Sequence, residues 1–155
     1  MPGPDPLSGL PGYALRRAAN AMMAELGERL AGESMRVSDA TVLMLAGDDA
    51  RRTASHIGQE LDIKRANMAS LLDRLEVVGL IAREPIDHKS LAIVLTPAGE
   101  AKLARVRTII ARFETTLIDK VPEPHRDHLL PALDALWRVQ SAQYGLLASR
   151  AVRDW

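Results

Sequence analysis

The stretch from Thr53 to Thr96 constrains the fold of this chain more than any other segment. It contains two short segments in which apolar residues recur every three or four positions, as on one face of a helix. Asp62 separates them, and aspartate tolerates the left-handed backbone of a tight turn better than most residues. Gly79 ends the second segment, and two β-type runs at 80–83 and 91–95 flank a polar tip. The predicted order is therefore helix, turn, helix and β-hairpin.

The second helix of this stretch, about Lys64 to Val78, combines a polar first turn with an apolar face at Met68, Leu71, Leu72 and Leu75. The major groove of DNA admits one α-helix, and the side chains of its first turns reach base edges. This order of elements therefore indicates a winged helix-turn-helix lobe that binds double-stranded DNA. Taken alone, a basic helix start is also typical of an ordinary solvated surface. The candidate contact residues of the helix are Lys64, Arg65, Asn67, Ser70 and Arg74.

Two helices are predicted on the N-terminal side of this lobe. Residues 10–30 form a helix with one apolar face, and Gly32 ends it. Ser38 is suited to cap a second helix that runs to Ala46, because its hydroxyl can accept a hydrogen bond from a free backbone N–H. The apolar face of the first helix consists of Leu15, Ala19, Met22, Leu26 and Leu30.

Two further helices are predicted on the C-terminal side. Thr96 and Pro97 start the first of them, because proline at the first helical position loses no hydrogen bond. The sequence VPEPHRDH then interrupts the pattern, and Pro131 predicts a kink or a restart of the last helix near residues 127–131. The apolar positions suit helices that pack side by side. They are Leu103, Val106, Ile110, Phe113 and Leu117 in one helix, and Leu133, Leu136, Trp137, Gln140, Tyr144 and Leu147 in the other.

The predicted fold class is thus mostly α with a small β-hairpin wing. Residues 35–96 form the winged helix-turn-helix lobe, and residues 10–34 and 97–150 form a helical region. Residues 1–9 and 151–155 are expected to be loose termini, since the first of these stretches lacks the features of a signal peptide.

Composition limits the classes of function that this chain can have. Its 155 residues are 47% hydrophobic and 26% charged, which is typical of a folded domain, and no apolar run reaches the roughly 18 residues of a membrane helix. We therefore expect a cytoplasmic protein without a membrane partner. The formal net charge of zero argues against nonspecific coating of nucleic acid but allows a local basic face. The absence of cysteine excludes disulfides, thiolate metal sites and sensing by thiol oxidation.

Other chemistry is not indicated. His125 and His128 share a helical face, but a metal site needs three or four converging ligands, so neither a metal nor another cofactor is predicted. The pairs Asp87–His88 and Asp127–His128 are sequence neighbours that do not face each other, and no nucleophile motif or phosphate loop accompanies them. We do not expect an enzyme.

The lobe resembles the MarR family of bacterial transcription regulators. The resemblance is carried by the segments ASHIGQELDIKRANMASLLDRLEVVGLI and VLTPAGE, with an acidic–basic wing between them, and it is close from Val37 to Lys102. It implies a homodimer in which the first helix and the last two helices intertwine. Two winged lobes then present their recognition helices to adjacent major grooves of a pseudo-palindromic operator.

The resemblance also implies roles for single residues. Lys64, Arg65, Asn67 and Ser70 occupy positions at which this family contacts bases and phosphates, whereas Arg74 occupies a position that more often supports the lobe. At the wing, His88, Lys89 and Ser90 are the DNA-contact candidates. The family usually has Asp-Arg-Arg at this tip, and this chain has Asp-His-Lys. Lysine lacks the planar fork of arginine, so we expect Lys89 to contact phosphate rather than to read the minor groove.

The family further implies a ligand pocket between the dimer helices and the lobe. Its candidate residues here are Met22 and Met44, with Arg16 or Arg17 facing an anionic effector such as an aromatic carboxylate. Core filling by the methionines and surface or dimer contacts by the arginines are the alternatives. The sequence thus predicts a dimeric repressor released by a small ligand. The alternative is a winged-helix module that contacts other proteins and has no DNA operator.

Overall fold

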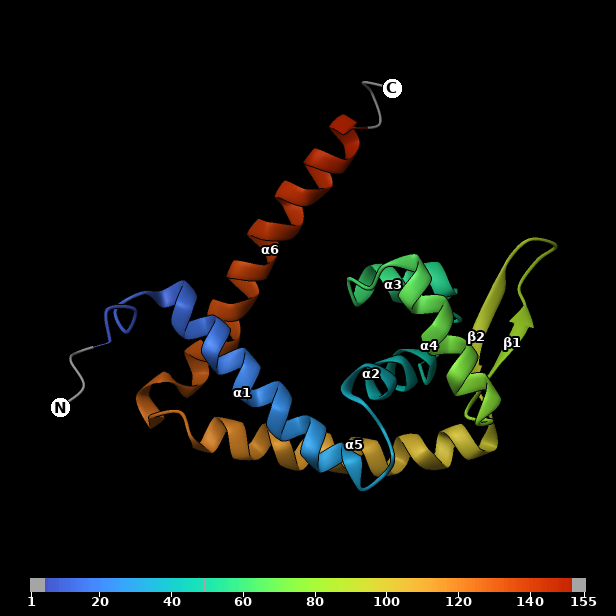
Figure 1. The fold of residues 1–155 in the computed structure, drawn as a ribbon, viewed down its shortest axis with the longest axis horizontal. Helices are drawn as coiled ribbons and strands as arrows, with labels where there is room; N and C mark the ends of the chain where they lie inside the picture. The colour runs from blue at the N-terminus through green and yellow to red at the C-terminus, as the bar shows by residue number, and fades with distance from the viewer. Residues whose placement is uncertain (1–4, 49, 152–155) are drawn as a thin grey trace. The chain divides into compact units, whose positions relative to one another are not determined.

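The structure is a computed structural model that describes residues 5–48 and 50–151, with residues 139–151 as backbone only. The chain divides at Phe113 into two compact units, which are described separately. The predicted fold class is confirmed: the described elements are mostly helices, together with one β-hairpin (Figure 1). The elements are α1 (Pro11–Ala31), α2 (Val37–Ala46), α3 (Ala54–Glu60), α4 (Arg65–Val77), β1 (Ile81–Pro85), β2 (Leu91–Leu95), α5 (Pro97–Asp119), a 3-10 turn (Glu123–His125) and α6 (Arg126–Ala151).

The core of the first unit lies where α2, α3, α4 and the hairpin meet. The predicted apolar face of α4 is buried as a whole, and it packs with fully buried side chains from the neighbouring elements. Burial of each such side chain removes about 1.5–3 kcal/mol of unfavourable contact with water, so this cluster fixes the lobe. The main members are Val42, Leu43, Ile57, Met68, Leu72, Ile81 and Ile93.

The turn between α3 and α4 is short and close-packed. Asp62 has a φ of 52°, as the sequence predicted for this position. The next residue, Ile63, donates its backbone N–H to the carbonyl of Gly58 at 2.9 Å. A Cβ at Gly58 would lie 3.3 Å from the Ile63 carbonyl oxygen and 3.5 Å from Met68, so glycine allows the two helices to approach closely.

The wing is an antiparallel hairpin in which Ile81 faces Leu95 and Pro85 faces Leu91. Its first strand extends two residues beyond the predicted end at residue 83. The segment before α3 joins the same sheet, because Thr53 bridges Ala92 and Ile93 donates its backbone N–H to the carbonyl of Arg52 at 2.9 Å. This contact connects the start of the helix-turn-helix directly to the wing.

The start of α5 is attached to the root of the wing. Gly79 has a φ of 74°, and Thr96 donates its hydroxyl to the Gly79 carbonyl at 2.6 Å. The same hydroxyl accepts the backbone N–H of Gly99 at 3.0 Å, which confirms Thr96 as the N-cap. A Cβ at Gly99 would lie only 1.9 Å from the carbonyl oxygen of Leu80, so any larger residue there would force α5 away from the wing.

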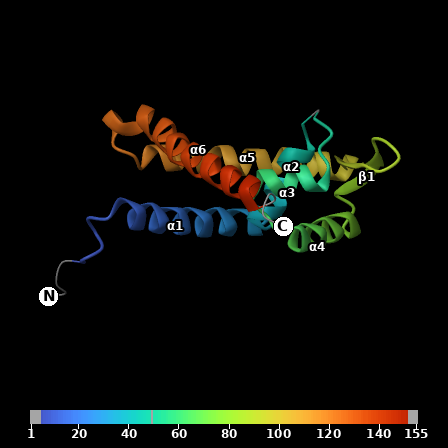
Figure 2. The ribbon, with the colours of Figure 1, turned by 90° about the horizontal axis from the view of Figure 1, so that it is seen from above.

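The end of α1 is tied to α5 by charged groups. Glu33 pairs with Lys102 at 3.1 Å and with Arg105 at 2.9 Å, and the hydrogen bonds from Arg105 and Lys102 lower the pKa of its carboxyl group. Further along, the guanidinium of Arg29 lies 5.5 Å from the centre of the Phe113 ring. Figure 2 shows this end of α1 beside α5.

The predicted apolar face of α1 is only partly buried within the chain. Leu26 and Leu30 are buried, whereas Leu15 and Ala19 are exposed. The N-terminal half of the helix therefore presents apolar groups that no other element of its own unit covers.

The predicted cap of α2 is wrong. The helix begins one residue before Ser38, at Val37, and the carboxylate of Asp39 accepts the backbone N–H of Arg36 at 3.0 Å. Aspartate at the third helical position satisfies this donor and suits the positive end of the helix dipole, so it makes a serine cap unnecessary.

The second unit contains the 3-10 turn and α6. Arg126 donates to the carbonyl of Val121 at 2.9 Å, which holds the turn before the helix. The predicted restart occurs at this residue, one position before the expected range, and α6 then continues through Pro131. Leu136 and Trp137 are exposed, at 55% and 61%. Gln140, Tyr144 and Leu147 lie outside the described side chains.

At the N-terminus, residues 6–9 form turns, and Asp5 pairs with Arg17 at 3.2 Å. Residues 1–4 and 152–155 lie outside the described part of the chain. None of the helices in the described part combines the length and the apolar character needed to cross a membrane.

Candidate DNA-binding surface

The first turns of α4 form an exposed polar edge. Lys64, Arg65, Asn67 and Ser70 are all exposed, because the buried stripe of the helix faces the opposite way. Lys64 occupies the N-cap position, and its side chain makes no capping hydrogen bond. The first backbone N–H groups of α4 are thus without a side-chain cap, and such a helix start attracts anions, including phosphate.

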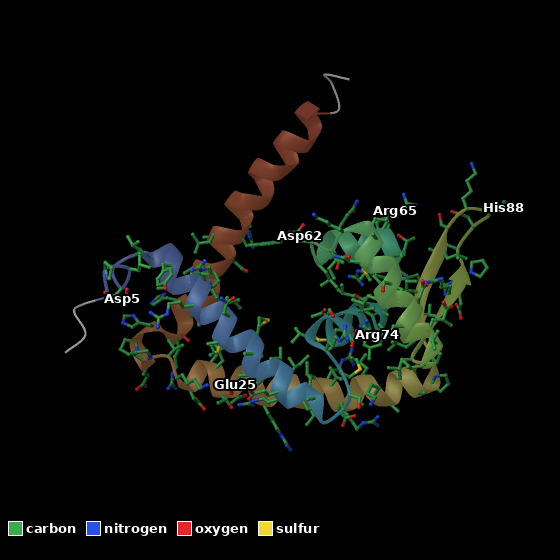
Figure 3. The ribbon with its side chains drawn as sticks, viewed as in Figure 1. Asp5, Glu25, Asp62, Arg65, Arg74 and His88 are labelled. Carbon is green, nitrogen blue, oxygen red and sulfur yellow. The ribbon has the colours of Figure 1, made fainter. Side chains whose placement is uncertain are left out.

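A groove of about 880 Å³ lies between α3, α4 and the wing. Lys64 and Arg65 line it from the recognition helix, and Lys89 and Ser90 line it from the wing. Figure 3 shows Arg65 and His88 at the same edge of the lobe, although His88 is outside the lining of the groove. The structure therefore brings together candidate residues that are about 25 positions apart in the sequence.

Five polar residues of the lining were not among the predicted contacts, and one of them is Asp62 in the turn before α4. Thr53, Ser55 and Gln59 come from α3 and its cap, and Arg83 comes from β1. Ser55 and Gln59 are four positions apart on the exposed side of α3, so the polar face of that helix was the available signal. Arg83 pairs with Asp73 at 2.5 Å and with Glu76 at 3.3 Å, and thereby holds the wing against α4.

The wing tip is organised by one carboxylate. Asp87 accepts the backbone N–H groups of Lys89 and Ser90, each at 2.8 Å. These hydrogen bonds, above all that from Lys89, lower the pKa of Asp87. The ionised carboxylate therefore stabilises the turn at neutral pH, and this contribution is lost only as the pH falls through the lowered pKa. His88 and Lys89 are exposed on the turn that Asp87 defines.

Arg74 does not share the exposed edge of α4. Its guanidinium pairs with Asp39 of α2, whose residue surface is only 4% exposed, and Figure 3 shows Arg74 on the inner side of the lobe. Since a buried carboxylate requires a partner, the structure assigns Arg74 to the attachment of α4 to α2. This ion pair agrees with the supporting role that the family resemblance implies for Arg74, and a DNA contact by Arg74 stays a prediction.

The predicted effector residues are not gathered in a described cavity. The guanidinium groups of Arg16 and Arg17 lie 5.1 and 5.7 Å from the centre of the Tyr13 ring, and both arginines are exposed. Met22 is half-buried and Met44 is exposed. None of the four lines the groove or the smaller cavity of about 260 Å³ between Glu33, Arg74 and Lys102.

Within residues 5–48 and 50–151, no three His, Asp or Glu side chains converge as metal ligands would. His125 and His128 are exposed at the start of the second unit. Their geometry offers no coordination site of the kind that needs three or four ligands.

A recognition helix with an exposed polar start, joined to a β-hairpin wing, defines a winged helix-turn-helix transcription regulator. Comparison with solved structures agrees with this class. The transcriptional repressor CouR bound to a 23-mer DNA duplex is 34% identical, covers 84% of this chain and 94% of its own, and has a TM-score of 0.77. The chain belongs to the MarR family of transcription regulators.

Three further solved structures are also similar to this chain. CouR bound to p-coumaroyl-CoA is 33% identical over 85% of this chain and 94% of its own, with a TM-score of 0.77. A MarR-family regulator from Rhodococcus sp. RHA1 shares the fold at 19% sequence identity, with a TM-score of 0.75 over 86% of this chain and 97% of its own. BpsR of Bordetella bronchiseptica shares it at 20% identity, with a TM-score of 0.75 and the same coverage of both chains. A scan against sequence profiles of whole families finds no match.

The pairing of Arg74 with Asp39 gives a test of the supporting role of Arg74. Arg74→Ala should destabilise the protein by about 2 kcal/mol in denaturant unfolding, because it leaves a buried carboxylate with a single hydrogen-bond donor. Arg65→Ala, in the exposed first turn of the same helix, is the control and should leave stability unchanged. Unaltered stability of Arg74→Ala together with a loss of DNA affinity would return Arg74 to the DNA surface.

Proposed function

We propose that this regulator is a dimeric repressor in which α4 reads the major groove of a pseudo-palindromic operator. The observation that carries this proposal is the exposed, uncapped start of α4, with Lys64, Arg65 and Asn67 on its outer side. Arginine pairs with guanine and asparagine with adenine, while lysine and the free N–H groups suit phosphate. The DNA complex of CouR supports the same use of the lobe. Such a regulator acts in the cytoplasm, where its operator is.

The wing is proposed to contact the DNA backbone. Lys89 and Ser90 line the same groove as Arg65, so a phosphate strand between α4 and the hairpin would meet donors from both sides. His88 lies at the tip beside them. Because lysine is a compact, strongly hydrated cation, it suits a phosphate contact better than entry into a narrow minor groove.

A second copy of the chain is proposed to cover the apolar helices outside the lobe. Residues 10–34 and 97–150 would form this dimerisation region, and residues 35–96 the DNA-binding lobe. Leu15 and Met23 on α1, and Leu133, Leu136 and Trp137 on α6, are exposed in the single chain. Apolar groups at this density on long helices are typical of an interface between subunits.

The effector is proposed to be an aromatic acid or its CoA thioester. CouR has been solved with p-coumaroyl-CoA, and DNA binding by BpsR is described as regulated by 6-hydroxynicotinic acid. Arg16 and Arg17 provide exposed cations for such an anion, and Met22 and Met44 provide adaptable apolar surface. The ligand would favour a spacing of the two recognition helices that no longer matches half-sites one helical turn apart.

DNA recognition is tested by Arg65→Ala in gel shifts with the protein's own promoter region. Loss of a base contact should weaken operator binding by about 1–3 kcal/mol, or roughly 5- to 150-fold. Arg107→Ala, which removes an exposed arginine from α5, is the control with the same change in charge. Equal affinity of the Arg65 variant and the native protein would remove this residue from the interface. Binding without salt dependence would favour a protein-contact module instead.

Dimerisation is tested by light scattering at micromolar concentration, where we expect the mass of two chains. Leu136→Glu should shift the protein toward monomers, because it puts a charge on the apolar face of α6. Ala135→Glu, on the opposite side of that helix, should leave the dimer intact. A native protein that is monomeric under these conditions contradicts the proposed architecture.

The effector is tested by adding p-coumaric acid, p-coumaroyl-CoA or free CoA to the operator complex. One of the two aromatic compounds should weaken operator binding by about tenfold or more, which corresponds to roughly 1.4 kcal/mol of coupling. Free CoA is the control that lacks the aromatic group. Operator affinity that none of the three alters at millimolar concentration would count against an effector of this class.

A further inference from the structure

Asp62 stands at the turn that leads into the recognition helix. It is exposed, and it lines the same groove as Lys64, Arg65 and Lys89. Figure 3 shows Asp62 and Arg65 on the same side of the lobe. Two peptide units separate Asp62 from Lys64, so its carboxylate is close to the cations that are proposed to approach DNA. A carboxylate at this position would oppose their attraction to phosphate.

No hydrogen bond or ion pair within the described residues explains why a carboxylate occupies position 62. Within the described residues, the Asp62 side chain takes part in none of the hydrogen bonds or ion pairs, whereas Asp39, Asp73 and Asp87 all have one. Its backbone φ of 52° also does not require a charge. Asparagine and glycine adopt this conformation at least as readily. The negative charge at position 62 is therefore dispensable for the turn.

The size of the opposing effect follows from the charge density of DNA. A duplex carries one negative charge for about every 1.7 Å of its axis, and charges interact over a Debye length of about 8–10 Å at physiological salt. A carboxylate beside the groove-facing end of α4 lies within this range of several phosphates once Arg65 contacts the duplex. The chain has no excess positive charge to offset the repulsion, since its formal net charge is zero.

We propose that Asp62 is a specificity determinant that lowers the affinity of the lobe for the DNA backbone irrespective of sequence. This inference rests on the proposed DNA-binding role of α4. Binding to random sequence depends almost entirely on phosphate contacts, so the repulsion between Asp62 and the phosphates lowers this affinity by its full amount. In the operator complex, base contacts hold α4 in one register in which the carboxylate can turn away from the phosphates, whereas a protein that slides on random sequence brings it past each phosphate in turn. The carboxylate thus increases the ratio of operator affinity to random-sequence affinity.

The experiment compares Asp62→Asn and Asp62→Gly with the native protein on a promoter duplex and on a random duplex of equal length. Both variants remove the charge and keep the positive φ. On the random duplex we expect binding about threefold to tenfold tighter for each dimer, with a steeper dependence on salt. The gain on the promoter duplex should be smaller. Asp127→Asn makes the same change of net charge in the second unit and should alter neither affinity.

Several results would overturn the inference. Random-sequence affinity that is unchanged or weaker in both variants would show that the carboxylate does not oppose the backbone. Weaker promoter binding by both variants would instead indicate that Asp62 accepts a hydrogen bond from a base, as aspartate does from cytosine. A native protein that binds neither duplex with salt dependence would contradict the proposed function itself, whatever the variants do.

Discussion

The burial of one face of α4 is the constraint on which the rest of the lobe depends. Met68, Leu71, Leu72 and Leu75 pack against α2, α3 and the hairpin, so the opposite face of the helix must be presented to solvent. A helix that rotated about its axis would expose these side chains at a cost of several kcal/mol. The direction in which the polar first turn projects is therefore set by hydrophobic packing, and DNA contacts use an orientation that already exists before binding.

Ion pairs add to the hydrophobic packing that orients α4, but they do not set that orientation. Asp39 with Arg74 and the pairing of Arg83 with Asp73 and Glu76 act on α4 from two neighbouring elements. Arg52 pairs with Asp48 and with Glu60 at the end of α3, and the hydrogen bond from Arg52 lowers the pKa of Asp48. Four of the eight Lys and Arg side chains of residues 35–96 are thus paired with carboxylates of the same lobe, namely Arg51, Arg52, Arg74 and Arg83. The few that remain on the outer edge have the larger influence on where an anionic partner binds.

Local chemistry made some features predictable from sequence, and tertiary contacts decided the others. The turn at Asp62, the end of α4 at Gly79 and the cap at Thr96 were predicted, because each depends on the backbone preferences of one residue. The cap of α2 was mispredicted, because Asp39 satisfies the same donor from inside the helix. The family resemblance implied a supporting role for Arg74, but the sequence could not reveal its partner, which lies 35 positions earlier. The groove residues of α3 and the exposed half of α1 likewise depend on how the elements pack.

The contact of Gly99 with Leu80 has a mechanical consequence. A helix whose first turn touches the backbone of the wing root, with Thr96 bonded to Gly79, cannot tilt without carrying the hairpin along. The junction is rigid rather than hinge-like, because backbone groups pack directly against each other there, with no flexible linker and no movable side chain between them. A tilt of the first turn of α5 would thus move the root of the hairpin with it, and the displacement would grow with distance along the hairpin toward its tip.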